Sequence, residues 1–131
     1  MAGELILIVE DNEKNRRLVR DVLQVKGYRT AESETAEEGI RLAHELRPAL
    51  ILMDIQLPGM DGIAALGHLR ADPRTRAIPV IAVTASAMTH NRQQIAAAGF
   101  DGYQTKPIHV KGFLEAVRAM LDRRPGSGGS S

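Results

Sequence analysis

Short apolar runs alternate along this chain with segments of helical periodicity, and this alternation constrains the fold more than any other feature. The runs at residues 5–9, 50–53 and 79–84 are almost uniformly apolar. They are too short for surface helices and are typical of strands buried on both faces of a parallel sheet. Residues 28–33 are more polar and predict an edge strand. Residues 102–105 predict a weak fifth strand, mainly from their place in the alternation.

Amphipathic segments separate these runs. We expect helices at residues 15–26, 35–46, 62–71, 88–98 and 110–123. The apolar stripe of the first consists of Leu18, Val19, Val22, Leu23 and Val25. Thr35 and Glu38 have the spacing of a capping box at the start of the second helix. Five strands alternating with five helices predict an α/β fold of the (βα)5 type, a doubly wound five-stranded parallel sheet covered by helices on both faces.

Length and composition predict one folded domain and exclude several kinds of site. Residues 4–123 form the predicted domain, and residues 124–131 form a Gly/Ser-rich tail that we expect to be flexible. The formal net charge of +1 gives no reason to expect nucleic acid or an anionic membrane as partner. With no cysteine, disulfides and thiolate chemistry are excluded. No apolar stretch is long enough to span a membrane and no signal peptide is recognisable, so we predict a cytoplasmic protein.

Polar groups stand at four of the predicted strand ends. Glu10 and Asp11 follow the first strand, Asp54 closes the third, Thr84 ends the fourth and Lys106 follows the fifth. In a doubly wound sheet, function gathers beyond the carboxyl ends of the strands, so these groups are expected to meet in one site. One alternative is that the first two acids only cap a helix and the third only caps a turn. The combination of all five residues favours a common site.

Three carboxylates in one place repel each other strongly. Two charges about 4 Å apart cost on the order of 4 kcal/mol at an effective dielectric constant near 20. A hard divalent cation relieves this repulsion, and oxygen ligands without histidine or cysteine favour Mg²⁺, or Mn²⁺, over zinc.

With this pattern, the chain resembles the receiver domains of bacterial two-component response regulators over residues 4 to about 123. The stretches MDIQLPGMDG, residues 53–62, and IPVIAVTA, residues 78–85, are especially similar to single-domain regulators of the DivK type. The resemblance implies a CheY-like, flavodoxin-like sheet with strand order 2-1-3-4-5. It also implies that Asp54 accepts a phosphoryl group from a phosphohistidine on a histidine kinase or histidine phosphotransfer protein.

The resemblance also implies a metal site around the acceptor. Asp11 and Asp54 are expected to bind Mg²⁺ directly, together with the backbone carbonyl of Gln56, whereas Glu10 acts through a metal-bound water. Gln56 stands where the family tunes the lifetime of the acyl phosphate.

Two further roles follow from the resemblance. Lys106 and Thr84 are expected to hold phosphoryl oxygens, as phosphoryl transfer requires. Thr84 and Tyr103 resemble a switch pair that signals to a protein target through the face formed by the fourth helix, fifth strand and fifth helix. The domain is expected to catalyse its own phosphorylation and dephosphorylation rather than to act as a turnover enzyme, and to be a monomer or weak dimer. The Lys106–Pro107 bond is a candidate cis peptide, although trans is the generic expectation.

Other residues suggest simpler roles. The basic residues Lys14, Arg16, Arg17 and Arg20 predict a solvated helix face, with docking of the phosphoryl donor as the alternative. Asp61 is expected to cap the third helix.

Competing functions fit less well. A phosphatase of the haloacid dehalogenase type needs a second Asp two residues after the nucleophile, where this chain has Gln56. An FMN-binding flavodoxin is disfavoured because Asp11 and Glu13 would repel the cofactor phosphate. Within the resembled family, the chain is either a single-domain regulator, which we favour, or a receiver module from a hybrid kinase or multidomain regulator.

Overall fold

The computed structural model describes residues 3–85 and 92–123 and confirms the predicted fold class. Five parallel strands form one sheet in the order β2-β1-β3-β4-β5. The strands are β1 (Leu5–Val9), β2 (Arg29–Ser33), β3 (Leu50–Asp54), β4 (Val80–Thr84) and β5 (Gly102–Thr105). The more polar β2 lies at one edge of the sheet, as its composition predicted.

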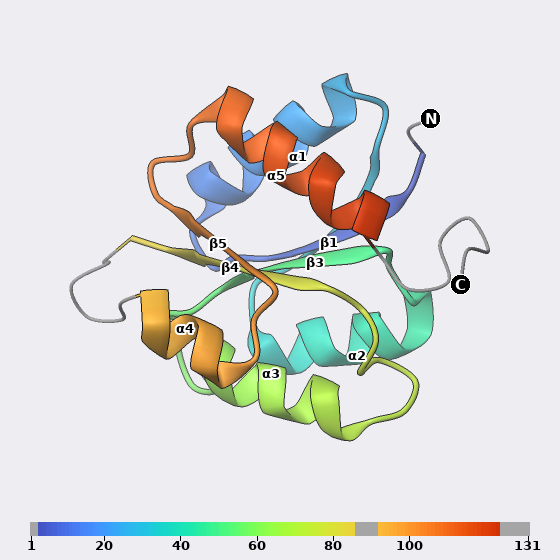
Figure 1. Cartoon of the computed structure of the whole chain (residues 1–131), viewed down its shortest axis with the longest axis vertical. Helices are drawn as coiled ribbons and strands as arrows, with labels where there is room; N and C mark the ends of the chain where they lie inside the picture. The colour runs from blue at the N-terminus through green and yellow to red at the C-terminus, as the bar shows by residue number, and fades with distance from the viewer. Residues whose placement is uncertain (1–2, 86–91, 124–131) are drawn as a thin grey trace.

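Helices cover both faces of this sheet. They are α1 (Glu13–Val25), α2 (Ala36–Leu46), α3 (Gly62–Ala71), α4 (Arg92–Ala98) and α5 (Val110–Arg123). Helices α1 and α5 lie on one face, and α2, α3 and α4 lie on the other (Figure 1). Residues 88–91 of the predicted fourth helix and the predicted tail lie outside the described residues. No helix within the described ranges is long and apolar enough to cross a membrane.

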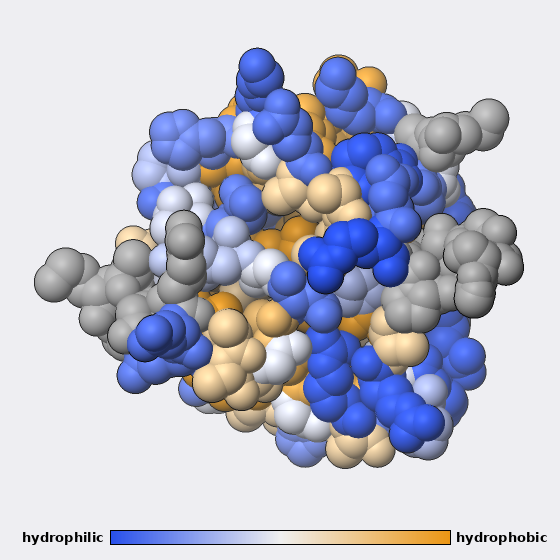
Figure 2. Space-filling view, in the orientation of Figure 1, coloured by the Kyte–Doolittle hydropathy of each residue, from blue (hydrophilic) through white to orange (hydrophobic). Residues whose placement is uncertain are grey.

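The central strands are buried on both sides, which explains their uniformly apolar sequences. In β1, Ile6 and Ile8 pack beneath α1 and α5, whereas Leu7 and Val9 belong to the core beneath α2 and α3. This alternation gives each face of the sheet its own hydrophobic layer. Figure 2 shows mainly hydrophilic residues on the visible face, with apolar side chains exposed between them.

Side-chain caps set the starts of the first two helices. Asn12 accepts a hydrogen bond from the backbone N–H of Asn15, so α1 begins before the predicted start at residue 15. Thr35 accepts from the backbone N–H of Glu38, which confirms one half of the predicted capping box. The other half is wrong, because the Thr35 N–H donates to the Ser33 hydroxyl at 3.3 Å and not to the Glu38 carboxylate.

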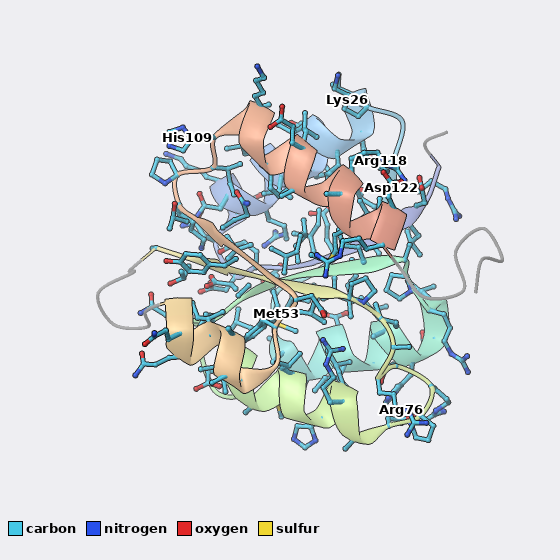
Figure 3. The ribbon with its side chains drawn as sticks, in the orientation of Figure 1. Lys26, Met53, Arg76, His109, Arg118 and Asp122 are labelled. Atoms are coloured by element: carbon cyan, nitrogen blue, oxygen red, sulfur yellow. The ribbon has the colours of Figure 1, made fainter. Side chains whose placement is uncertain are left out.

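An ion pair joins the start of the sheet to α5. Arg118 Nη2 lies 3.0 Å from Glu4 Oε2 and also pairs with Asp122 one turn further along α5 (Figure 3). The same guanidinium donates to the Tyr28 hydroxyl and lies over its ring. Partial burial opposes ionisation of Glu4, but a backbone hydrogen bond and Arg118 outweigh it, and the pKa of this carboxyl is lowered.

Candidate functional site

The carboxylate of Asp54 closes β3 at the centre of the sheet and is only 4% exposed. Its Oδ1 atom accepts a hydrogen bond of 3.0 Å from the backbone N–H of Gln56. Its Oδ2 atom lies 3.0 Å from Lys106 Nζ. The alternative that Asp54 only caps a turn therefore accounts for Oδ1 alone, because Oδ2 belongs to a buried ion pair.

Lys106 also binds Glu10, and so joins two carboxylates from different strand ends. Its Nζ atom lies 2.7 Å from Glu10 Oε1, and the other Glu10 oxygen accepts from the Asn12 N–H at 3.0 Å. Burial, together with repulsion from Asp54, raises the pKa of Glu10 against the opposing effect of Lys106. Burial alone lowers the pKa of Lys106, but its bonds to the two acids outweigh burial and raise it.

Asp11 completes an acidic cluster that fits a divalent cation. One carboxylate oxygen from each of Glu10, Asp11 and Asp54 lies within 4.8 Å of the others. The three carboxylates carry a formal charge of −3 and the Lys106 ammonium +1, which leaves −2. Hard oxygen ligands with this charge match the preferences of Mg²⁺. The alternative that the acids merely cap α1 is wrong, because Asn12 is the cap.

The structure brings the lysine to this cluster through its backbone. The Lys106 N–H donates to the carbonyl of Thr84 at 2.9 Å, which fixes the end of β5 against the end of β4. The Lys106–Pro107 peptide bond is cis, the isomer named as a candidate from the sequence.

Thr84 and Tyr103 lie on the same face of the sheet. Tyr103 pairs with Ala82 in the parallel register, and Ala82 and Thr84 are two residues apart on β4. Thr84 is fully buried, whereas Tyr103 is half-buried and packs against the core beneath α3 and α4. Tyr103 also lines an apolar hollow of about 310 Å³ between β5 and α4.

Gly62 holds the loop after Asp54 close to the strand. Its N–H donates to the carbonyl of Ile55 at 2.9 Å. A Cβ atom at this position would lie 2.9 Å from the Ile55 Cα and even closer to the Asp54 carbonyl oxygen. The sequence does not indicate this contact, because a glycine at this position also suits a turn. Asp61 accepts from the N–H of Ala64 and caps α3, as predicted.

The prediction of a solvated face on α1 is wrong for Arg16. Its side chain is only 12% exposed and donates to the backbone carbonyl of Glu10 at 3.0 Å. Arg17, by contrast, is exposed, and its one ion pair within the described residues is with Glu13 on its own helix, as a solvated face predicts. The helical pattern placed Arg16 on the outer side, but its long side chain turns back over the start of the helix.

Comparison with known proteins identifies the class to which this fold and site belong. The model of the response regulator receiver domain matches residues 6–118. The chain therefore belongs to the response regulator receiver domain family. Receiver domains accept a phosphoryl group from histidine kinases, signal to partners and are in general not turnover enzymes.

Curated relatives agree with this assignment over nearly the whole chain. The polar-differentiation response regulator DivK of Brucella anthropi is 45% identical over 116 residues, which cover 88% of this chain and 94% of that protein. DivK of Brucella ovis is 44% identical over the same shares.

Solved structures share the fold. The receiver domain of a sensor histidine kinase from Pseudomonas aeruginosa, described with a magnesium ion coordinated in the active site cleft, has a TM-score of 0.85 and 33% identity. It covers 92% of this chain and 99% of that one. A CheY-like receiver domain protein from Methanospirillum hungatei has a TM-score of 0.86 and 29% identity. The match covers 97% of this chain and 100% of that chain.

Proposed function

We propose that Asp54 is the phosphoryl acceptor of this receiver domain. The supporting observation is that its buried carboxylate lies at the end of the central strand within 3.0 Å of the Lys106 ammonium. Glu10 and Asp11 lie beside it in the same cluster. The donor is a phosphohistidine on a histidine kinase or a histidine phosphotransfer protein.

In the proposed reaction, a carboxylate oxygen of Asp54 attacks the phosphorus atom and forms an acyl phosphate. The phosphorus–nitrogen bond of the donor breaks, and its electron pair stays on the imidazole nitrogen, which takes up a proton from water. The Lys106 ammonium holds a phosphoryl oxygen and stabilises the developing negative charge. The Thr84 hydroxyl, at the end of the neighbouring strand, holds a second oxygen.

The acidic cluster is the proposed Mg²⁺ site. Asp11 and Asp54 bind the ion directly with the backbone carbonyl of Gln56, and Glu10 contributes through water. When bound, the cation neutralises the acidic cluster and the incoming phosphoryl oxygens, so that both can occupy one small space. The magnesium described for the Pseudomonas receiver domain supports this choice, and Mn²⁺ stays a prediction.

Output is proposed to pass through Thr84 and Tyr103. The phosphoryl group draws the Thr84 hydroxyl inward, and the Tyr103 ring turns into the space it leaves. The apolar hollow between β5 and α4 lies beside this ring and suits a protein target on the face formed by α4, β5 and α5. A monomer or weak dimer, a stand-alone regulator and a cytoplasmic location stay predictions.

The domain is proposed to catalyse phosphorylation and dephosphorylation of itself. Its acceptor, lysine and acidic cluster supply the alignment and charge that a small phosphodonor requires. The family assignment does not favour the haloacid dehalogenase alternative, and Gln56 stands where such a phosphatase needs its general acid.

Intact mass spectrometry with acetyl phosphate tests this proposal. With Mg²⁺, the wild-type chain is expected to gain one phosphoryl group that is stable to acid and labile to base. Asp54→Asn, which keeps the shape of the side chain, is expected to gain none. Asp11→Ala is expected to lose most of the gain through weaker Mg²⁺ binding. Equal uptake by wild type and Asp54→Asn would refute the acceptor assignment.

A further inference from the structure

We propose that Arg16 is a positioning residue that holds Asp11 in place for the metal ion. The inference rests on the proposed function, because Asp11 is a proposed ligand. Among the described contacts, Arg16 does not reach any of the three carboxylates of the cluster. It acts through the backbone of Glu10, the residue that joins β1 to Asp11.

All four polar groups of Glu10 have partners. Its N–H donates to the carbonyl of Ser33, and its two carboxylate oxygens accept from Lys106 and Asn12. Its carbonyl oxygen accepts from Arg16 Nη1 at 3.0 Å. The contact with Arg16 also acts on Asp11, because the Glu10 carbonyl belongs to the peptide group that joins Glu10 to Asp11.

Asp11 depends on this peptide group for its position. Its carboxylate is exposed, and within residues 3–85 and 92–123 no hydrogen bond or ion pair holds its side chain. A peptide unit is planar, so fixing the Glu10 carbonyl also fixes the Asp11 N–H and Cα. Arg16 therefore fixes the point from which the Asp11 side chain leaves the backbone.

The guanidinium of Arg16 is itself oriented from the neighbouring strand. Its Nε atom donates to Glu32 Oε1 at 3.1 Å, and its Nη2 atom lies 3.7 Å from Glu34 Oε2. A planar guanidinium can serve these partners in several directions at once, which a lysine ammonium on one stem cannot do with the same geometry. Partners that orient ligands without touching the metal commonly change metal affinity by 10–100-fold when removed.

Arg20 offers a matched control. It lies one turn further along α1 and also approaches Glu32, with Nη1 3.8 Å from Oε2. Arg20 also pairs with the side chain of Asp21, and within the described residues none of its hydrogen bonds or ion pairs reaches Glu10. Arg20→Ala therefore removes a cation from the same helix and from the same glutamate, but leaves the Glu10 carbonyl held.

Magnesium titration of isotopically labelled protein by NMR tests the inference on the full chain, with MgCl₂ alone as the probe. Arg16→Ala is expected to raise the dissociation constant for Mg²⁺ about tenfold, whereas Arg20→Ala leaves it within about twofold. In the metal-free protein, Arg16→Ala is expected to shift the Glu10 carbonyl carbon and Asp11 amide nitrogen resonances. A purely structural role for the helix would not single out this peptide group.

Arg16→Lys keeps the charge and is a milder second variant in case the alanine variant does not fold. We expect this variant to weaken Mg²⁺ binding about threefold, because an ammonium group replaces a planar guanidinium that donates to several partners at once. Wild-type affinity in Arg16→Lys, or equal weakening by Arg16→Ala and Arg20→Ala, would overturn the inference. Failure of the wild-type chain to bind Mg²⁺ would instead overturn the proposed metal site, so the two failures are distinguishable.

Discussion

Replacing Lys106 by methionine is expected to destabilise the metal-free protein severely and to make its stability depend on Mg²⁺. The methionine keeps most of the length and volume of the side chain but removes its charge. In the wild type, the ammonium lies 2.7 Å from Glu10 Oε1 and 3.0 Å from Asp54 Oδ2. The variant leaves both carboxylates without their cation.

The size of the effect follows from burial. The side chains of Glu10 and Asp54 are 6% and 4% exposed, so water cannot replace the lost partner. Removing one member of a buried ion pair costs about 3–5 kcal/mol, a large part of the roughly 5–15 kcal/mol that stabilises a domain. A loss of about 3 kcal/mol lowers the melting temperature of a domain of this size by about 10 °C. Mg²⁺ is expected to restore part of this loss, because it brings positive charge to the same carboxylates.

Urea denaturation with and without saturating Mg²⁺ measures both effects. Lys111→Met is the control, because it removes the same charge from an exposed position on α5. That variant is expected to stay within about 0.5 kcal/mol of wild type. A Lys106→Met variant as stable as Lys111→Met would refute the account of the buried ion pairs. An equal loss with and without Mg²⁺ would refute the shared role of lysine and metal.

Two further substitutions test the backbone around the site and the far end of the sheet. Gly62→Ala is expected to cost about 1–3 kcal/mol and to slow phosphorylation, because its Cβ would push against the Asp54–Ile55 backbone. Gly67→Ala on the same helix meets open space and should be neutral or stabilising; equal urea midpoints for the two variants would contradict this packing argument. Glu4→Gln is expected to reduce stability at pH 7, because Glu4 has a lowered pKa in the folded state and stabilises it when ionised. The stabilisation by ionised Glu4 is present above the ordinary pKa of 4.5 and is lost as the pH falls through the lower pKa of the folded state. The difference in free energy of unfolding between Glu4→Gln and wild type should therefore narrow in acid. A difference that stays constant between pH 7 and pH 3 would contradict the ion pair with Arg118.

The fold was predictable because burial on both faces leaves a strong signal in the sequence. Strands β1, β3 and β4 are uniformly apolar for that reason, and α3 and α5 have the predicted bounds. The apolar stripe of α1 was less reliable. Val19 and Leu23 are buried, but Leu18 is 42% and Val25 83% exposed, because these two residues lie seven apart at the margin of the stripe.

The site was predictable to the level of which residues meet, but not of which atoms pair. The parallel sheet brings Glu10, Asp54 and Lys106 to one edge, as their places at strand ends indicated. Nothing in the sequence indicated that one lysine bridges both acids, or that Arg16 reaches back to the Glu10 carbonyl. Both contacts depend on long side chains that cross between elements, and helical or strand periodicity carries no information about them.

Chemical mapping of the phosphorylated residue tests the central claim most directly. Borohydride reduces an acyl phosphate to the corresponding alcohol, which marks the acceptor permanently for peptide mass spectrometry. After treatment with acetyl phosphate and Mg²⁺, we expect the reduced residue at Asp54, and no reduction when Mg²⁺ is withheld. Reduction at Glu10 or Asp11, or Mg²⁺-independent labelling spread over exposed acids, would contradict the assignment of Asp54 as the phosphoryl acceptor.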